Sequence, residues 1–60
     1  MSTITLIKKV PAGALGNFNW HYKCKCSNGT AQKDVVVTSA NENEAKQLAQ
    51  LECDEKCGEV

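Results

Sequence analysis

The chain has 60 residues, the length of one small domain and too few for a second. Its seven lysines balance seven acidic residues, and it contains no arginine. No stretch approaches the ~20 consecutive apolar residues of a membrane-spanning helix, which excludes that class of protein. The sequence opens on Met1 without the basic start and apolar run of a signal peptide, so we expect a cytoplasmic location and no membrane partner.

Charge is divided unevenly along the chain. Residues 1–33 carry five lysines and no acid, whereas residues 34–60 carry all seven acids and two lysines. We therefore expect the two halves to form opposite faces or ends of the domain. Such a dipolar molecule can dock electrostatically without a net charge.

Three strands are expected in the first two thirds of the chain. Alternation of apolar and polar residues predicts a strand from Thr3 to Val10, followed by a loop with two glycines and a proline at 11–17. Residues 18–26 alternate without a break, which predicts one buried and one wet face. Asn28-Gly29 suits a type I′ hairpin turn, and Gln32 to Thr38 returns as the third strand, with Val35 and Val37 pointing inward.

One helix is expected after the strands. Asn41 is suited to its N-cap, Glu44 completes a capping-box pattern, and Gly58 is a natural stop. The apolar stripe of this helix consists of Ala45, Leu48, Ala49 and Cys53. The chain is thus predicted to be an α+β domain spanning residues 1–60, a three-stranded antiparallel meander with one C-terminal helix on one face.

The helix must cover the face that carries Trp20 and Tyr22, because nothing else in the chain can. The small side chains of Ala45 and Ala49 would let it approach these rings closely. The other face of the sheet stays open and is the predicted binding surface. Its candidate contact residues are Lys9, Asn19, His21, Lys23 and Lys25.

The four cysteines are expected to lie close together at one end of the core. Cys24 and Cys26 are two apart on a strand, and Cys53 and Cys57 are four apart on a helix, so each pair shares a side. Three explanations remain open: a zinc site with four cysteine ligands, one or two disulfides between strand and helix, and buried free thiols. We therefore expect either no cofactor or a zinc ion, with these four residues as the candidate ligands.

The sequence does not support catalysis. The single histidine, His21, has the opposite strand parity to Cys24 and Cys26, so it is not placed to act as a base for a thiol nucleophile. Gly13 and Gly16 do not lead into a helix, so they do not form a phosphate-binding loop. We therefore expect a binding module and not an enzyme.

Two classes of partner are compatible with the open sheet face. The element order is similar to that of the arm-binding domains of tyrosine recombinases, plant AP2-type domains and part of the double-stranded-RNA-binding fold. None of their motifs is present, so the resemblance implies no residue roles. The absence of arginine and a pI near 6.5 argue against nucleic acid. We therefore expect a monomer or homodimer of the inhibitor or accessory-factor type, which binds a protein partner through the open sheet face or the acidic helix. Nucleic acid bound to the open sheet face is the alternative.

Overall fold

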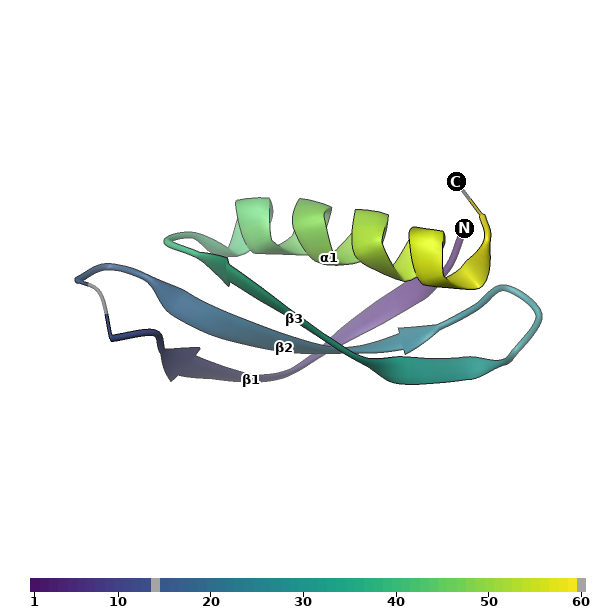
Figure 1. Ribbon diagram of the computed structural model, residues 1–60, viewed down its shortest axis with the longest axis horizontal. Coiled ribbons are helices and arrows are strands. Elements are labelled where there is room, and N and C mark those ends of the chain that lie inside the picture. The colour runs from purple at the N-terminus through teal and green to yellow at the C-terminus, as the bar shows by residue number, and fades with distance from the viewer. Residues whose placement is uncertain (14, 60) are drawn as a thin grey trace.

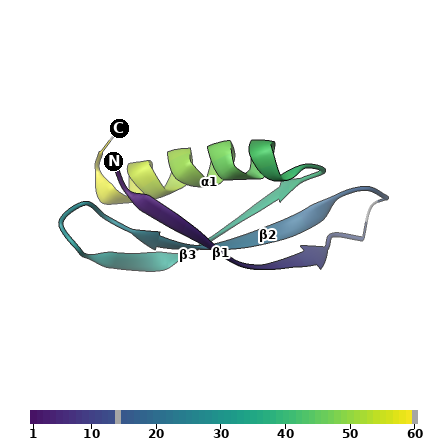
Figure 2. The ribbon, with the colours of Figure 1, turned by 180° about the vertical axis from the view of Figure 1, so that it is seen from behind.

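The computed structural model describes residues 1–13 and 15–59 and confirms the predicted element order. Strands β1 (Thr3–Pro11), β2 (Phe18–Lys25) and β3 (Ala31–Ser39) form one antiparallel sheet in the order β1-β2-β3, and helix α1 (Glu42–Cys57) follows. The helix covers one face of the twisted sheet and leaves the other uncovered (Figure 1). The view from behind shows the same two layers (Figure 2). No helix in the described part of the chain has the length and apolar character needed to cross a membrane.

The core lies between the sheet and the helix. Trp20 and Tyr22 of β2 are buried, as predicted, with 5% and 1% of their surface exposed. Ala45 and Ala49 are completely buried against them in the helix layer, so small side chains on α1 match large ones on the sheet. Trp20 also donates a hydrogen bond from Nε1 to the carbonyl oxygen of Ser39 at 2.9 Å, which satisfies its polar atom.

Leu48 departs from the predicted apolar stripe, because 43% of its surface is exposed. A helix turns about 100° per residue, so Leu48 is rotated by that angle from its neighbour Ala49 at the centre of the buried stripe. It therefore lies on the flank of α1 beside β3 and lines a shallow surface depression with Val37 and Leu51.

Both ends of the helix carry the predicted caps. The Asn41 side chain accepts a hydrogen bond from the Glu44 backbone N–H at 2.8 Å. The Glu44 carboxylate does not return to the Asn41 N–H as a simple capping box would. Instead it accepts from Ser39 Oγ at 2.9 Å, and Ser39 Oγ accepts from the Asn41 N–H at 3.2 Å. At the other end Gly58 adopts a φ of 71°, which glycine reaches at little steric cost, and ends the helix.

A β-bulge changes the side-chain pattern of β1. Leu6 pairs with Tyr22, but the next pair along the ladder joins Lys8 to His21, so Ile7 is an extra residue in the strand. From Lys8 onward the predicted alternation is therefore shifted by one. A second irregularity in β3, between the pairs Tyr22–Val35 and Cys24–Gln32, leaves Val35 and Val37 buried as predicted.

The hairpin between β2 and β3 differs from the predicted type I′ turn. The Gly29 N–H donates to the Cys26 carbonyl at 2.9 Å, which places Ser27 and Asn28 at the centre of the turn. A type I′ turn needs a positive φ at both central residues, and here only Gly29, with φ of 91°, has one. The Cys26 N–H donates to the Thr30 carbonyl, so the turn consists of the three residues between them, Ser27 to Gly29, with Gly29 in the left-handed conformation.

Candidate functional site

Two disulfides join the end of β2 to the end of α1. Cys24 is bonded to Cys53 and Cys26 to Cys57, with Cα–Cα distances of 5.6 and 5.5 Å. The predicted convergence of the four sulfurs is confirmed, and all four cysteines are paired. A sulfur in a disulfide is not a thiolate and offers zinc no anionic ligand, so the zinc prediction concerns a different, reduced state of these residues.

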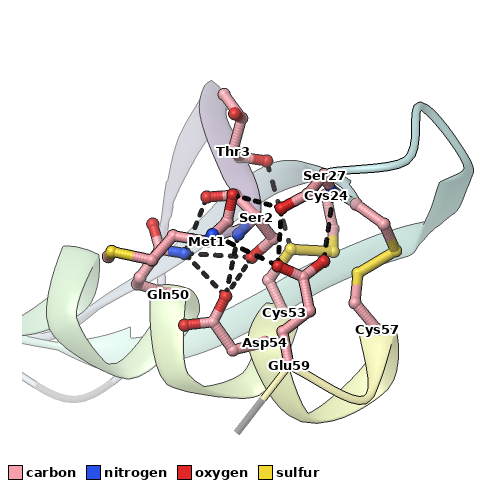
Figure 3. Close-up of polar contacts among 11 residues, drawn as sticks. Met1, Ser2, Thr3, Cys24, Ser27, Gln50, Cys53, Asp54, Cys57 and Glu59 are labelled. Carbon is pink, nitrogen blue, oxygen red and sulfur yellow. Dashed lines mark hydrogen bonds and ion pairs between the residues drawn. A yellow bond between two sulfur atoms is a disulfide. The ribbon is translucent and has the colours of Figure 1, made fainter.

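The N-terminal residues bind the same end of the helix, as the close-up shows (Figure 3). Ser2 is buried, and both its backbone N–H and its hydroxyl donate to Asp54 Oδ1. Gln50 Nε2 donates to the Ser2 carbonyl at 2.9 Å and to Asp54 Oδ1 at 3.1 Å. The hydrogen bonds from Ser2 are the main reason why the pKa of Asp54 lies below its ordinary value.

Glu59 extends this network beyond the helix. Its carboxylate accepts from the Ser27 hydroxyl at 2.6 Å and from the Ser27 backbone N–H at 3.0 Å. Oε1 also lies 3.3 Å from the α-amino group of Met1. These contacts, led by the Ser27 hydroxyl, lower the pKa of Glu59. Sequence reasoning missed the whole network, because its members are far apart in the chain and no local pattern connects them.

The second candidate site is the uncovered side of the sheet, here called the open sheet face. Lys23 and Lys25 are exposed on it, as predicted, while His21 and Asn19 in the central strand are half-buried. The pairing of the strands places on it Thr3, Thr5, Lys8, Val10, Asn19, His21, Lys23, Lys25, Ala31, Val36 and Thr38, and the residues Ile7, Lys33 and Asp34 lie beside them at the two bulges.

Lys9 does not belong to the open sheet face, contrary to the prediction. Because of the bulge at Ile7, Lys9 pairs with Trp20 and lies on the helix side of the sheet. Its Nζ atom is 4.4 Å from the centre of the Phe18 ring and 5.3 Å from that of Trp20, a cation–π arrangement. Lys8 takes the predicted place of Lys9, opposite His21 on the open sheet face.

The centre of the open sheet face is partly apolar. His21 pairs with Lys8 on one side and with Val36 on the other. The apolar side chains Ile7 and Val36 are 43% and 48% exposed, and Val10 is 38% exposed. Large apolar side chains exposed beside several lysines are typical of a surface that another molecule covers.

The open sheet face is also predominantly basic. It carries Lys8, Lys23 and Lys25, and the exposed residues Lys33 and Asp34 lie together at its β3 bulge. The exposed acids Glu42, Glu44, Glu52 and Glu55 belong to the helix layer instead. The uneven charge along the sequence thus becomes a separation between the two layers of the fold. Comparison with protein-family models, with curated proteins and with solved structures found no match.

Proposed function

We propose that the protein is a non-catalytic binding module whose open sheet face binds a protein partner. The observation that carries the proposal is the combination of exposed apolar side chains and lysines on a face that no other described element covers. Burying Ile7 and Val36 would supply hydrophobic free energy, at roughly 25 cal/mol per Å² of apolar surface. The lysines around them would steer the approach of the partner.

The charges of this face define the partner's surface. A complementary partner presents an apolar centre, to cover Ile7 and Val36, surrounded by carboxylates within reach of Lys8, Lys23 and Lys25. A binding role also agrees with the pairing of all four cysteines, because a disulfide-bonded sulfur cannot act as a nucleophile. His21 lies on the face opposite the disulfides, as predicted, and has no thiol beside it.

Site-specific photo-crosslinking in the cells that make the protein tests this proposal. A photoreactive residue at Val36 probes the open sheet face, and one at Leu51, which is 52% exposed on the helix, is the matched control. We expect a protein adduct from position 36 and none from position 51. Adducts from position 51 alone, or from neither position, would contradict the proposal.

Charge reversal then tests the recovered partner. We expect Lys8→Glu/Lys23→Glu/Lys25→Glu to slow association by roughly tenfold or more, because steering by opposite charges contributes factors of this size. The control Glu42→Lys/Glu52→Lys/Glu55→Lys alters three exposed helix residues and should not slow association, because it removes no positive charge from the open sheet face. A titration with labelled duplex DNA and RNA at two salt concentrations tests the alternative, since nucleic-acid binding weakens steeply with salt.

The disulfides bear on where this module works. Cytoplasmic glutathione and thioredoxin keep most thiols reduced, so two disulfides favour an oxidising compartment over the cytoplasm that the sequence predicts. Alkylating free thiols in intact cells before lysis, followed by intact mass measurement, separates the two locations. An oxidising compartment gives no alkylated cysteines, whereas a reducing one gives up to four.

A further inference from the structure

The sulfur atoms at the disulfide end of the domain form a tighter group than two separate cross-links require. The Sγ atoms of Cys24, Cys53 and Cys57 all lie within 4.8 Å of one another, although Cys57 is bonded to neither of the other two. Cys26 joins the group through its bond to Cys57. Cys57 thus brings the second disulfide next to the first, although Cys26 Sγ is not within 4.8 Å of both Cys24 Sγ and Cys53 Sγ.

This spacing is close to that of a tetrahedral zinc site. With Zn–S bonds of about 2.3 Å, the ligand sulfurs of such a site are about 3.8 Å apart. Reduction frees the bonded sulfurs to move apart toward that value, and Cys57 Sγ already lies within 4.8 Å of both sulfurs of the other disulfide. We propose that, when its two disulfides are reduced, the protein binds one Zn²⁺ ion through the thiolates of Cys24, Cys26, Cys53 and Cys57.

A dithiol can supply the electrons and protons that reduction of the two disulfides requires. Two dithiol molecules deliver four electrons and four protons to the two disulfides and are themselves oxidised to disulfides, which leaves four cysteine thiols. Zn²⁺ then displaces the four thiol protons, and the resulting site carries two negative charges. Metal binding therefore replaces one set of cross-links between β2 and α1 by another.

The backbone that carries the four residues does not depend on the disulfides alone. Cys24 pairs with Ile4 of β1 and Gln32 of β3, and the Cys26 N–H donates to the Thr30 carbonyl at 2.8 Å. On the helix side, the contacts of Ser2 with Asp54 hold the turn that contains Cys53. These contacts keep the strand and helix ligands near each other after reduction.

One polar neighbour can donate a hydrogen bond to a thiolate ligand, and two acidic neighbours repel its negative charge. Gln32 Nε2 lies 3.5 Å from Cys26 Sγ and points its N–H donor at it, the type of contact that stabilises a metal-bound thiolate. Asp54 and Glu59 are acidic neighbours in the chain, but each already accepts hydrogen bonds from a serine, Ser2 and Ser27 respectively. The Glu59 carboxylate also lies within 4.8 Å of Cys26 and Cys57 Sγ. Its oxygen therefore competes with Cys26 Sγ for the fourth position on the metal.

Spectroscopic titration of the reduced full-length chain with Co²⁺ and then Zn²⁺ tests the proposal. The protein is reduced with a dithiol and freed of it under anaerobic conditions. We expect one Co²⁺ per chain with the strong sulfur-to-metal charge-transfer and visible bands of tetrahedral thiolate coordination, and their loss when Zn²⁺ displaces the cobalt. Weak octahedral bands, binding of less than one metal per chain, or equal binding by the oxidised chain would overturn the proposal.

Two variants identify the fourth ligand. Cys26→Ser should weaken metal binding at least tenfold and reduce the charge-transfer intensity by roughly one quarter, because one of four thiolates is lost. Glu59→Gln is the matched control and should retain the full thiolate spectrum. If Glu59→Gln weakens binding and Cys26→Ser does not, the four-cysteine assignment is wrong. Thermal melting of reduced wild-type protein gives an independent readout, since zinc should raise its melting temperature.

Discussion

At the scale of single residues, this core depends on a few large side chains of β2 packed against very small ones of α1. Trp20 and Tyr22 are the largest buried side chains of the core, and Ala45 and Ala49 allow the helix to lie close to them. A 60-residue domain buries only about 60% of the surface of its unfolded chain, so each large buried group has a strong effect on stability. The alternation in residues 18–26 was sufficient to predict which rings are buried.

Trp20→Ala should lower the free energy of unfolding by about 3–5 kcal/mol, because it removes a buried ring and leaves a cavity. Leu51→Ala is the control, since Leu51 is half exposed and its truncation should change stability by less than ~1 kcal/mol. Denaturant unfolding of the disulfide-bonded proteins measures both. Similar midpoints for Trp20→Ala and the wild type would mean that Trp20 is not part of the core.

Tyr22→Phe should leave the free energy of unfolding at neutral pH unchanged or raise it, by at most about 3 kcal/mol. The Tyr22 hydroxyl is buried and has no hydrogen-bond partner among the described residues, so its removal relieves a desolvation cost. A clear loss of stability in Tyr22→Phe would show that the hydroxyl has a partner.

Tyr22 should also make the disulfide-bonded protein less stable in alkali. Burial, together with the nearby Glu42 charge, raises the pKa of Tyr22 in the folded state above its ordinary value of about 10. The unfolded chain therefore loses this proton first, and stability should fall as the pH rises above about 10. Unfolding curves across that range measure the effect, and Tyr22→Phe should lack this part of the decline.

At the scale of elements, local patterns predicted the strands, the helix and its caps, but not the faces along the whole of β1. The Asn41 cap and the Gly58 stop are local features that a sequence displays. The bulge at Ile7 is not, because whether a strand gains an extra residue depends on its pairing with β2. This one residue moves Lys9 to the helix side and Lys8 to the open sheet face, so Lys8 takes the place predicted for Lys9.

Asn41→Ala should lower the free energy of unfolding by about 0.5–2 kcal/mol, because the Glu44 N–H loses the side-chain oxygen that it bonds. Asn43→Ala, also exposed but inside the helix, is the control. Alanine is the better helix former, so this second variant should be neutral or slightly more stable. Equal effects of the two substitutions, measured by denaturant unfolding, would rule out a specific capping contribution.

At the scale of the whole molecule, the cross-links are concentrated at one end. Met1 and Glu59 lie side by side there. The β2–β3 hairpin is at the same end, while the end of β1 and the start of α1 lie at the other end (Figures 1 and 2). Both disulfides and the contacts of Ser2 and Glu59 belong to the first end. The sequence predicted the convergence of the sulfurs from strand and helix periodicity, but it left their chemistry open.

The two disulfides should differ in their contribution to stability although they close loops of almost equal length. Their sequence separations of 29 and 31 residues predict about 3–4 kcal/mol each from the lost entropy of the unfolded chain. Cys24 and Cys53 are almost completely buried, whereas Cys57 is half-buried. Cys24→Ala/Cys53→Ala should therefore add a packing loss to the entropy term and destabilise the fold more than Cys26→Ala/Cys57→Ala. Denaturant unfolding of the two double variants measures the difference.

The same difference in burial should set the order in which the wild-type disulfides open. Because Cys57 is more accessible than Cys24 or Cys53, a thiolate reductant reaches the bond between Cys57 and Cys26 first. Mild reduction followed by alkylation and mass spectrometry of peptides should therefore label Cys26 and Cys57 before the other pair. If the Cys24–Cys53 bond opens first, the packing between β2 and α1 does not protect that disulfide from the reductant.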